Sequence, residues 1–284
     1  MSTLLEVYRK AVKRLENPEK DEINIRILLS TLANVNSMSD FYIKGDMEFK
    51  KEKQFNELFE KYLSGVPVDY LLHKTTFFGY DFYIDSRVLI PRQETEEVIE
   101  YAYKILKEKY GDKPLIIADI CTGSGCAGIA LAMKLNAKKL YLTDYSEQAL
   151  LVAKKNVEKY KNVLPKTIIR KGDSMFPLII DRYCRPDVVI SNPPYIIDRE
   201  MVDENVKKYE PILALYTTSY IGVYRTILSD VMNLYQNNVD IFFEMSDEVD
   251  KYIGGFARSS CPEWMPTSFY DMNGHLRCLY LKKY

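Results

Sequence analysis

The second two-thirds of the chain alternates apolar, strand-like runs with helical segments. Strand-like runs are expected at 115–119, 139–144, 167–170 and 188–191, with helices at 94–109, 126–135 and 146–160. Strands that alternate with helices pair in parallel, because each crossover returns the chain to the same end of the sheet. The pattern predicts an α/β fold with a doubly wound, mostly parallel sheet. Further strands are expected at 240–244 and 277–281, the last antiparallel at an edge.

The first 75 residues are expected to form a separate helical domain. Apolar residues recur there at helical spacing, and we expect them to form its core: Leu4, Tyr8, Ala11, Val12 and Leu15, then Ile23, Ile27, Leu28 and Leu32, then Phe55, Leu58, Phe59, Tyr62 and Leu63. Residues 76–90 are rich in aromatic and β-branched side chains around Gly79-Tyr80-Asp81, which predicts a linking β-hairpin. Residues 91–284 are expected to form the α/β domain.

Composition excludes several classes of protein. The 284 residues carry 39 Lys+Arg against 40 Asp+Glu, a formal net charge of -1, which argues against broad electrostatic binding of nucleic acid. Five cysteines without a C-x-x-C pair, and two histidines, offer too few ligands for a structural zinc site. The odd number of thiols, and a start without signal-peptide features, predict a cytoplasmic protein. No apolar stretch approaches the ~18–20 residues of a membrane span.

The tetrapeptide Asn192-Pro193-Pro194-Tyr195 directly follows the strand-like run at 188–191. A planar NH2 group is a poor nucleophile because its lone pair is delocalised. The Asn192 side-chain oxygen and the Pro193 carbonyl are two acceptors for its hydrogens, and Tyr195 is suited to stack on it. The prolines, Pro194 included, would stiffen the turn. We therefore predict these four residues to be catalytic, against the alternative of an ordinary proline-stiffened turn.

Glycine and acidic residues follow the preceding strands in order. Asp119-Ile120-Cys121-Thr122-Gly123-Ser124-Gly125 forms the first strand-to-helix turn, where ligands of such sheets bind. Asp144 ends the next strand and is suited to accept two ribose hydroxyls; Asp173 is suited to accept from an adenine amino group. Together they predict an S-adenosylmethionine site. The two alternatives are a turn that binds no ligand and a dinucleotide site. The predicted cofactor-binding residues are Asp119, Cys121, Thr122, Gly123, Ser124, Gly125, Asp144, Asp173, Ser174 and Asn192.

With these motifs the chain resembles, over essentially its full length, the bacterial peptide chain release factor N5-glutamine methyltransferases, the HemK/PrmC group. The segments that carry the resemblance are 64–72, 77–79, Leu89-Ile90-Pro91-Arg92-Gln93-Glu94-Thr95-Glu96, 146–150, Tyr209-Glu210-Pro211 with Ala214-Leu215, Tyr224-Arg225, and Asp271, Gly274 and Arg277. The chain departs from the family at Gln93, usually proline, at Cys121, usually glycine, and in the loop from Tyr216 to Gly222, which is usually richer in glycine.

The resemblance implies a class I S-adenosylmethionine-dependent methyltransferase, Rossmann-like, with a seven-stranded sheet. It also implies the reaction: methylation of the side-chain amide nitrogen (N5) of the glutamine in the Gly-Gly-Gln motif of class I release factors, which modulates translation termination. No strong general base is required, because the amide proton becomes acidic once the nitrogen is methylated. The helical domain would dock the release factor, and we expect a monomer that contacts neither nucleic acid nor membrane. An N6-adenine methyltransferase of DNA or RNA, and a non-catalytic cofactor-binding protein, remain alternatives.

Overall fold

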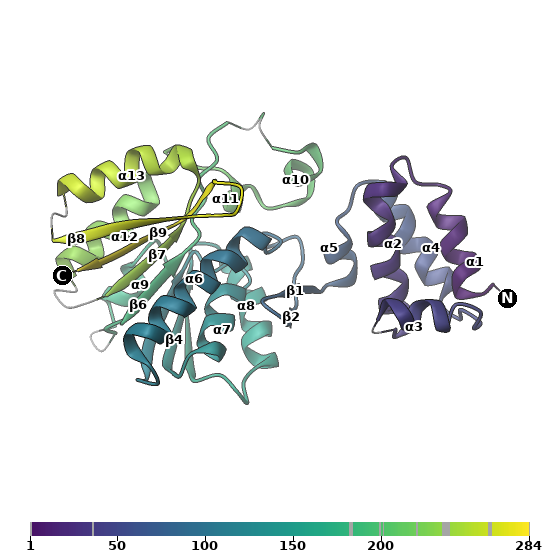
Figure 1. The fold of residues 1–284 in the computed structure, drawn as a ribbon, viewed down its shortest axis with the longest axis horizontal. Helices are drawn as coiled ribbons and strands as arrows, with labels where there is room; N and C mark the ends of the chain where they lie inside the picture. Colours follow the sequence, from purple (N-terminus) through teal and green to yellow (C-terminus); the bar gives the residue numbers. More distant parts are fainter. Residues whose placement is uncertain are drawn as a thin grey trace. The chain divides into compact units, whose positions relative to one another are not determined.

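The structure is a computed structural model that describes residues 2–35, 37–181, 184–198, 200, 202–219, 221–234, 239–260 and 263–283. Tyr220 of the loop from Tyr216 to Gly222, and Cys261, one of the five cysteines, lie outside these ranges. The chain divides into two compact units, Met1–Lys74 and Thr75–Tyr284, so the hairpin groups with the α/β unit. Figure 1 labels most of the helices and strands of both units.

The first unit is helical, and its helices pack around a core that includes Leu28, Phe41 and Phe55. They are α1 (Leu4–Val12), α2 (Pro18–Ala33), α3 (Met38–Ile43), α4 (Glu52–Leu63) and α5 (Val68–Leu72). Both α3 and α5 were missed, since five or six residues are too few to show a helical period.

Three residues predicted for this core lie at the surface instead. Ile23, Ile27 and Leu63 are 53%, 42% and 38% exposed. The buried side of α2 consists of Ile25, Leu28, Leu29 and Leu32. Ile23 and Ile27 each lie two positions from Ile25, about 200° around a helix, and therefore face away from the core.

The linking hairpin is shorter than predicted. Its strands are β1 (Thr75–Phe77) and β2 (Tyr80–Phe82), which pair antiparallel across Phe78 and Gly79. Both turn residues have positive φ (51° and 78°), which matches the twist of a two-residue hairpin. Beyond β2 the backbone is held by a side chain: Tyr83 donates its N–H to Asn156 Oδ1 (2.7 Å), and Asn156 Nδ2 donates to the Tyr83 carbonyl (2.9 Å).

One mixed sheet organises the second unit, and it confirms the predicted seven-stranded, mostly parallel topology. Its strands lie in the order β5-β4-β3-β6-β7-β9-β8, of which the first five are parallel and the last two antiparallel to their neighbours. They are β3 (Leu115–Ile120), β4 (Ala137–Asp144), β5 (Lys166–Lys171), β6 (Val188–Ser191), β7 (Asp240–Glu244), β8 (Trp264–Tyr270) and β9 (Leu276–Lys283).

The C-terminal strand β9 is antiparallel as predicted, but it is not at the edge of the sheet. It lies between β7 and β8, and β8 forms the edge. The sequence did not reveal β8, because its side chains alternate in burial and Pro266 interrupts the run.

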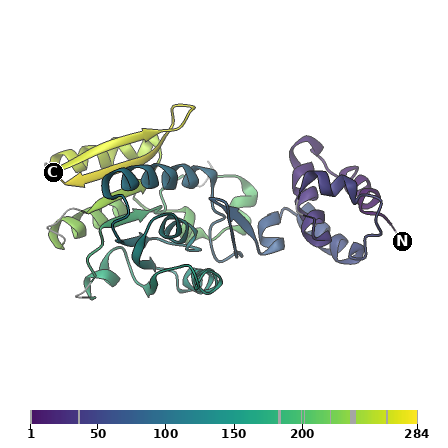
Figure 2. The same ribbon diagram turned by 60° about the horizontal axis from the view of Figure 1, so that its bottom comes forward.

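Helices cover both faces of the sheet (Figures 1 and 2). Alternate side chains of β3 enter different cores: Ile117 packs in one, whereas Ala118 and Ile120 pack in the other. The first core contains residues of α6 (Gln93–Tyr110), α7 (Cys126–Lys134) and α8 (Glu147–Lys159). The second contains residues of α9 (Phe176–Ile179), α12 (Gly222–Leu234) and α13 (Asp247–Ser260). The short helices α10 (Glu204–Tyr209) and α11 (Ile212–Leu215) lie between β6 and β7 in sequence.

The order of the strands reverses at β3. The chain runs outward from β3 through β4 to β5, then returns to β6 on the other side of β3. Loops leave the two sides of such a switch point in opposite directions, which opens a crevice at the carboxyl ends of the strands. None of the described helices is both long and apolar enough to cross a bilayer.

Candidate active site

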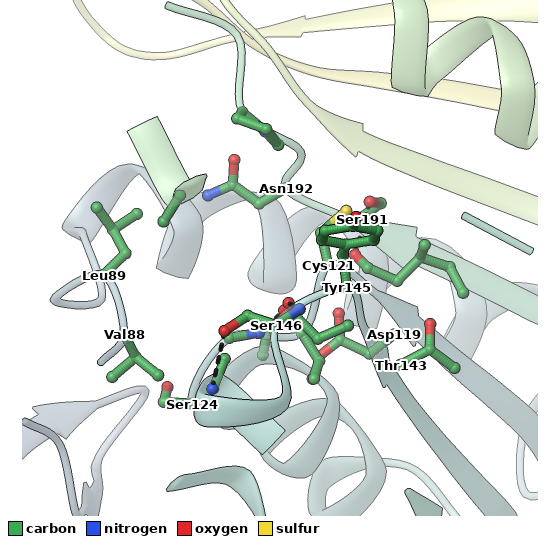
Figure 3. A pocket seen from close by; sticks show the side chains of 18 of the residues that line it. Val88, Leu89, Asp119, Cys121, Ser124, Thr143, Tyr145, Ser146, Ser191 and Asn192 are labelled. Carbon is green, nitrogen blue, oxygen red and sulfur yellow. Dashed lines mark hydrogen bonds between the residues drawn. The ribbon is translucent and has the colours of Figure 1, made fainter. Parts of the chain in front are cut away.

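A cavity of about 580 Å³ lies at the switch point, in the size range of small-molecule sites. It brings together nine of the ten predicted cofactor-binding residues: Asp119, Cys121, Thr122, Gly123, Ser124, Asp144, Asp173, Ser174 and Asn192. The tenth, Gly125, is not in the lining and caps the start of α7. Figure 3 shows Asn192 and Ser191 beside this cavity, with Val88 and Leu89 bordering the same space.

Asp119, near the end of β3, holds the turn that follows this strand. This buried carboxyl accepts hydrogen bonds from Thr122 Oγ1 (2.6 Å) and from the Gly128 N–H (3.0 Å). A Cβ at Gly128 would lie only 2.8 Å from Asp119, so only glycine permits this approach. Burial raises the pKa of Asp119 to about 7. Asp119 therefore shapes the turn, and its carboxyl is already engaged by the protein.

Asp144 occupies the carboxyl end of β4 with both oxygens in use. Oδ2 accepts from the Gly123 N–H (2.9 Å) and Oδ1 from the Ser146 N–H (2.8 Å). Burial raises the pKa of Asp144, and the two backbone hydrogen bonds partly oppose that shift. Each carboxylate oxygen keeps a second lone pair, so the group is able to accept two hydroxyls from a ligand in the cavity.

Two hydroxyls in the cavity wall lack partners among the described residues. Ser174 Oγ and Thr143 Oγ1 are buried and make no hydrogen bond there. Ser174 also has a φ of 49°, which is strained for a residue with a side chain, while the neighbouring Asp173 is exposed. Buried hydroxyls are usually satisfied, so this wall fits a ligand with polar groups of its own. The residues present therefore suit a nucleoside with a ribose diol.

The predicted catalytic tetrapeptide leaves β6 at the cavity, but only half of it lines the wall. Asn192 and Pro194 are in the lining, whereas Pro193 and Tyr195 are not. Pro193 is buried, and the half-buried ring of Tyr195 packs against the core that includes residues of α12 and α13. Burial raises the pKa of Tyr195 to about 12, so its phenol is neutral at physiological pH.

A further acidic residue, Glu244, lines the cavity and was not predicted. It ends β7, the strand next to β6, and is only 4% exposed. Burial raises its pKa to about 7, while hydrogen bonds with the side chains of Thr95 and Asn192 act in the opposite direction. Its signal in the sequence is an acid directly after an apolar strand, as at Asp144.

The comparisons with known proteins agree with this geometry. Residues 98–209 match the model of the Methyltransferase small domain family, and residues 6–72 match that of the PrmC N-terminal domain. A curated release factor glutamine methyltransferase of Bacillus anthracis is 28% identical over 279 residues, 97% of each chain. One from Chlorobaculum tepidum is 31% identical over 243 residues, 83% of this chain and 81% of its own. This chain belongs to the release factor glutamine methyltransferase family.

Solved structures support the fold of this family member. A crystal structure of the N-terminal domain of human METTL16 in complex with SAH matches with a TM-score of 0.55 and 18% identity, covering 95% of this chain and 98% of that one. The human methyltransferase 10 domain containing protein matches with a TM-score of 0.51 at 18% identity, covering 73% and 91%. At this identity the likeness concerns the fold alone, and it confirms the class I methyltransferase architecture.

The family signature at 89–96 joins three parts of the α/β unit. Arg92 forms an ion pair with the buried Glu210, which also accepts from the Ile90 N–H (3.1 Å). Glu96 accepts from the Phe78 N–H of the hairpin turn (2.9 Å). The signature therefore fixes the Tyr209-Glu210-Pro211 segment and the hairpin to the start of α6. Gln93 is the first residue of α6, a position where the family's proline would lose no hydrogen bond.

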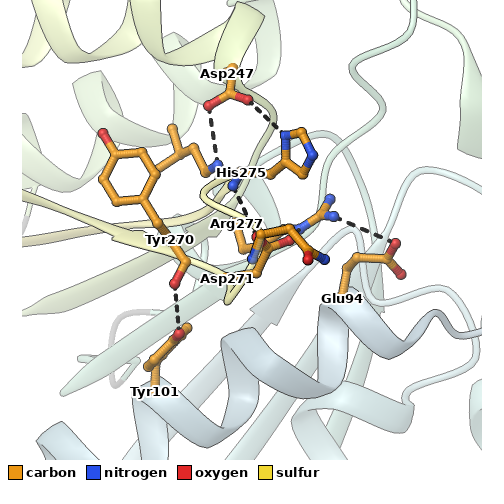
Figure 4. Close-up of polar contacts among 9 residues, drawn as sticks. Glu94, Tyr101, Asp247, Tyr270, Asp271, His275 and Arg277 are labelled. Atoms are coloured by element: carbon orange, nitrogen blue, oxygen red, sulfur yellow. Dashed lines mark hydrogen bonds and ion pairs between the residues drawn. The ribbon is translucent and has the colours of Figure 1, made fainter.

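Glu94 connects the signature to the C-terminal strands. Arg277 Nε donates to Asp271 Oδ2 (2.8 Å), and Arg277 lies 3.8 Å from the Glu94 carboxylate. Figure 4 shows this cluster together with the bond from the Tyr101 hydroxyl to the Tyr270 carbonyl (2.9 Å). The closing family residues Asp271 and Arg277 thus hold the β8–β9 turn near the start of α6.

The altered loop that begins at Tyr216 runs beside the residues that follow the tetrapeptide. Tyr216 pairs with Ile196 as an isolated bridge, and the Thr217 N–H donates to the Ile196 carbonyl (2.9 Å). Tyr216 also lines the cavity, along with Pro211, Ile212, Leu213 and Ala214. The start of the altered loop is therefore held by backbone pairing to Ile196, directly after the tetrapeptide.

Cys121 stands where the family usually has glycine, and its backbone shows why glycine is preferred. Its φ is 60°, in the left-handed region that costs a residue with a side chain roughly 1–2 kcal/mol. We expect Cys121→Gly to be more stable than Cys121→Ala by about 1 kcal/mol, because both lose the thiol and only alanine keeps the strain. Urea unfolding of the two variants measures the difference. Equal stability, or a more stable alanine variant, would refute backbone strain at this position.

Proposed function

We propose that this enzyme transfers a methyl group from S-adenosylmethionine to the side-chain amide nitrogen of the glutamine in the Gly-Gly-Gln motif of class I release factors. One observation carries the proposal: a single cavity holds both the glycine turn with Asp144 and the corner at Asn192 and Pro194. When bound, S-adenosylmethionine supplies an activated methyl carbon, so the protein mainly has to position the acceptor nitrogen.

The cofactor end of the cavity is formed by strands β3, β4 and β5. Asp144 would accept the ribose hydroxyls, and the unpartnered Ser174 Oγ, beside Asp173, would face the base. The turn at Cys121 and Gly123 would bring the backbone close to the ligand. Asp119 would contribute indirectly, by holding that turn against α7.

The acceptor end is formed by the residues that follow β6. The Asn192 oxygen and the Pro193 carbonyl would each accept one N–H of the glutamine amide, which favours a pyramidal and more nucleophilic nitrogen. Tyr195, whose ring packs against the core outside the cavity lining, would have to turn that ring toward the substrate to lie on the amide plane. The α11 side chains Ile212 and Leu213 line the cavity, are 55% and 65% exposed, and would contact the peptide around the glutamine.

The test is a methyl-transfer reaction with labelled S-adenosylmethionine and a purified release factor. Mass spectrometry of the Gly-Gly-Gln peptide should locate one added methyl on the glutamine. A release factor with asparagine in place of that glutamine is the matched control and should stay unlabelled. Label on added DNA or RNA, with none on the factor, would instead support adenine methylation and refute the proposal.

The helical unit is proposed to dock the release factor. It exposes large apolar side chains, which mark interaction surfaces when they are numerous: Ile23, Ile27, Met38, Tyr42, Ile43 and Met47. We place the reaction in the cytoplasm with a monomeric enzyme, which size-exclusion chromatography tests.

Replacing Ile43, which is 78% exposed, by serine is expected to raise KM for the full-length release factor several-fold. The change removes apolar contact area remote from the chemistry, so methylation of a short Gly-Gly-Gln peptide should be unaffected. Steady-state kinetics with the two substrates make the comparison. An equal effect on both substrates, or on neither, would argue against docking through Ile43.

A further inference from the structure

The side-chain amide of Asn192 has to point one way to serve the reaction. Its oxygen accepts an N–H from a substrate amide, whereas its NH2 group is a donor and would repel that N–H. The two orientations have almost the same shape, so packing alone distinguishes them poorly. The hydrogen-bond partners around Asn192 decide which end faces the substrate.

The side chains beside the NH2 group of Asn192, those of Thr95 and Glu244, are both able to accept a hydrogen bond. Asn192 Nδ2 donates to Thr95 Oγ1 over 3.4 Å, a long and weak bond. Ser191 of β6 pairs with Phe243 of β7, so the next residues, Asn192 and Glu244, leave adjacent strands side by side. The side chains of Thr95 and Asn192 both act to lower the pKa of Glu244, as donors beside its carboxylate would. Its Oε2 atom has no partner among the residues that the structure describes, although it is buried at the cavity wall.

We propose that the Glu244 carboxylate holds the NH2 end of Asn192 and so turns the Asn192 oxygen toward the substrate amide. Glu244 is then a positioning residue: it acts through Asn192 and accepts from its Nδ2. This assignment rests on the proposed function, because it matters only if Asn192 receives an N–H from the substrate. It adds a residue to the reaction that neither the tetrapeptide nor the glycine turn includes.

An ionised carboxylate only accepts hydrogen bonds, whereas a protonated carboxyl also donates one. Protonated Glu244 is therefore able to donate to the Asn192 oxygen and stabilise the unproductive orientation. The charged or titratable neighbours of Glu244 come from two helices, one strand and the tetrapeptide. They are Glu94 on α6, Tyr224 on α12, Arg277 and Cys278 on β9, and Tyr195. Glu94 opposes ionisation and Arg277 favours it, while burial is the largest influence and raises the pKa to about 7.

Above pH 7 Glu244 is ionised and the productive orientation is favoured; below pH 7 it is protonated and that preference is lost. Between pH 8 and pH 6 the ionised fraction of a group with a pKa of 7 falls about tenfold. We expect kcat/KM for a Gly-Gly-Gln peptide to fall about tenfold over that interval in the wild-type enzyme.

The decisive variant is Glu244→Gln, which keeps the shape and accepts from Nδ2 through its amide oxygen but does not ionise. We expect it to retain measurable activity, to bind the cofactor as tightly as wild type by calorimetry, and to lose the pH dependence. Glu244→Ala should lose more activity than Glu244→Gln at every pH. Its kcat should fall by more than any decrease in the midpoint of thermal unfolding accounts for. A pH profile that persists in Glu244→Gln would overturn the proposal and point to Asp119, whose pKa is also about 7.

Glu94→Gln is the matched control for charge. It removes the like charge near Glu244 without touching the cavity lining, so the midpoint of the wild-type pH profile should move to lower pH. An unchanged midpoint, or one at higher pH, would contradict the assignment to Glu244.

A readout without substrate separates this proposal from the proposed function. The side-chain NH2 resonances of Asn192, identified by their loss in Asn192→Asp, should shift with a midpoint near pH 7 in the free wild-type protein. They should not shift in Glu244→Gln. Asn192 NH2 resonances that show no midpoint near pH 7 in the wild-type protein would overturn the positioning role, even if the release factor is methylated. Failure of methylation with the shift intact would instead refute the proposed function.

Discussion

Replacing Asn192 by alanine is expected to lower kcat by roughly 10²–10³, the usual cost of removing one oriented polar group that stabilises a transition state. Alanine leaves one N–H of the glutamine amide without an acceptor, while the Pro193 carbonyl remains. Single-turnover kinetics with saturating Gly-Gly-Gln peptide measure the effect on the chemical step.

Asn205→Ala provides the same chemical change at an exposed position on α10 and should leave kcat unchanged. Calorimetry should show that Asn192→Ala still binds the cofactor with affinity reduced by no more than about tenfold, because the other predicted cofactor-binding residues follow strands β3, β4 and β5 and are unchanged. A kcat for Asn192→Ala within about twofold of wild type would refute the role of Asn192 as an acceptor.

The second large effect is expected at Asp144. Alanine there removes a carboxylate that would hold two ribose hydroxyls and already holds the N–H groups of Gly123 and Ser146. Hydrogen bonds to a charged group contribute about 1.5–3 kcal/mol each, so losing two predicts at least roughly 10²-fold weaker cofactor binding. Isothermal titration calorimetry with S-adenosylmethionine measures it.

Glu147→Gln is the control for Asp144. Glu147 is also acidic and lies three residues further along, but its side chain is 69% exposed and pairs with Lys171 at the surface. Its replacement should not change cofactor affinity. If Asp144→Ala and Glu147→Gln bound the cofactor equally tightly, Asp144 would not be a ribose ligand.

The parallel part of the sheet was predictable because its signals are local. Each of its strands contains a short apolar stretch, and the helices between them are long enough to show a period, as in α6 and α8. The edge strand β8 depends on pairing with β9, which leaves no continuous apolar run in the sequence. The exposure of Ile23 and Ile27 likewise depends on how helices pack, which spacing alone does not determine.

The candidate site was predictable where chemistry follows a strand end. The glycine turn, Asp144 and Asn192 were recognised because each lies at the end of a strand or directly after it. Glu244 follows the same rule at β7 but lacks a flanking motif, so nothing in the sequence distinguished it from a solvated acid. Buried polar residues that hold the backbone of a distant segment were also missed. Asn156 is one of them, because its burial results only from tertiary packing.

The most direct test is a crystal structure with S-adenosylhomocysteine and a Gly-Gly-Gln peptide bound together. We expect the glutamine amide nitrogen within hydrogen-bond distance of both the Asn192 side-chain oxygen and the Pro193 carbonyl, facing the sulfur. A glutamine held elsewhere in the cavity, or an Asn192 that presents its NH2 group to the peptide, would contradict the account.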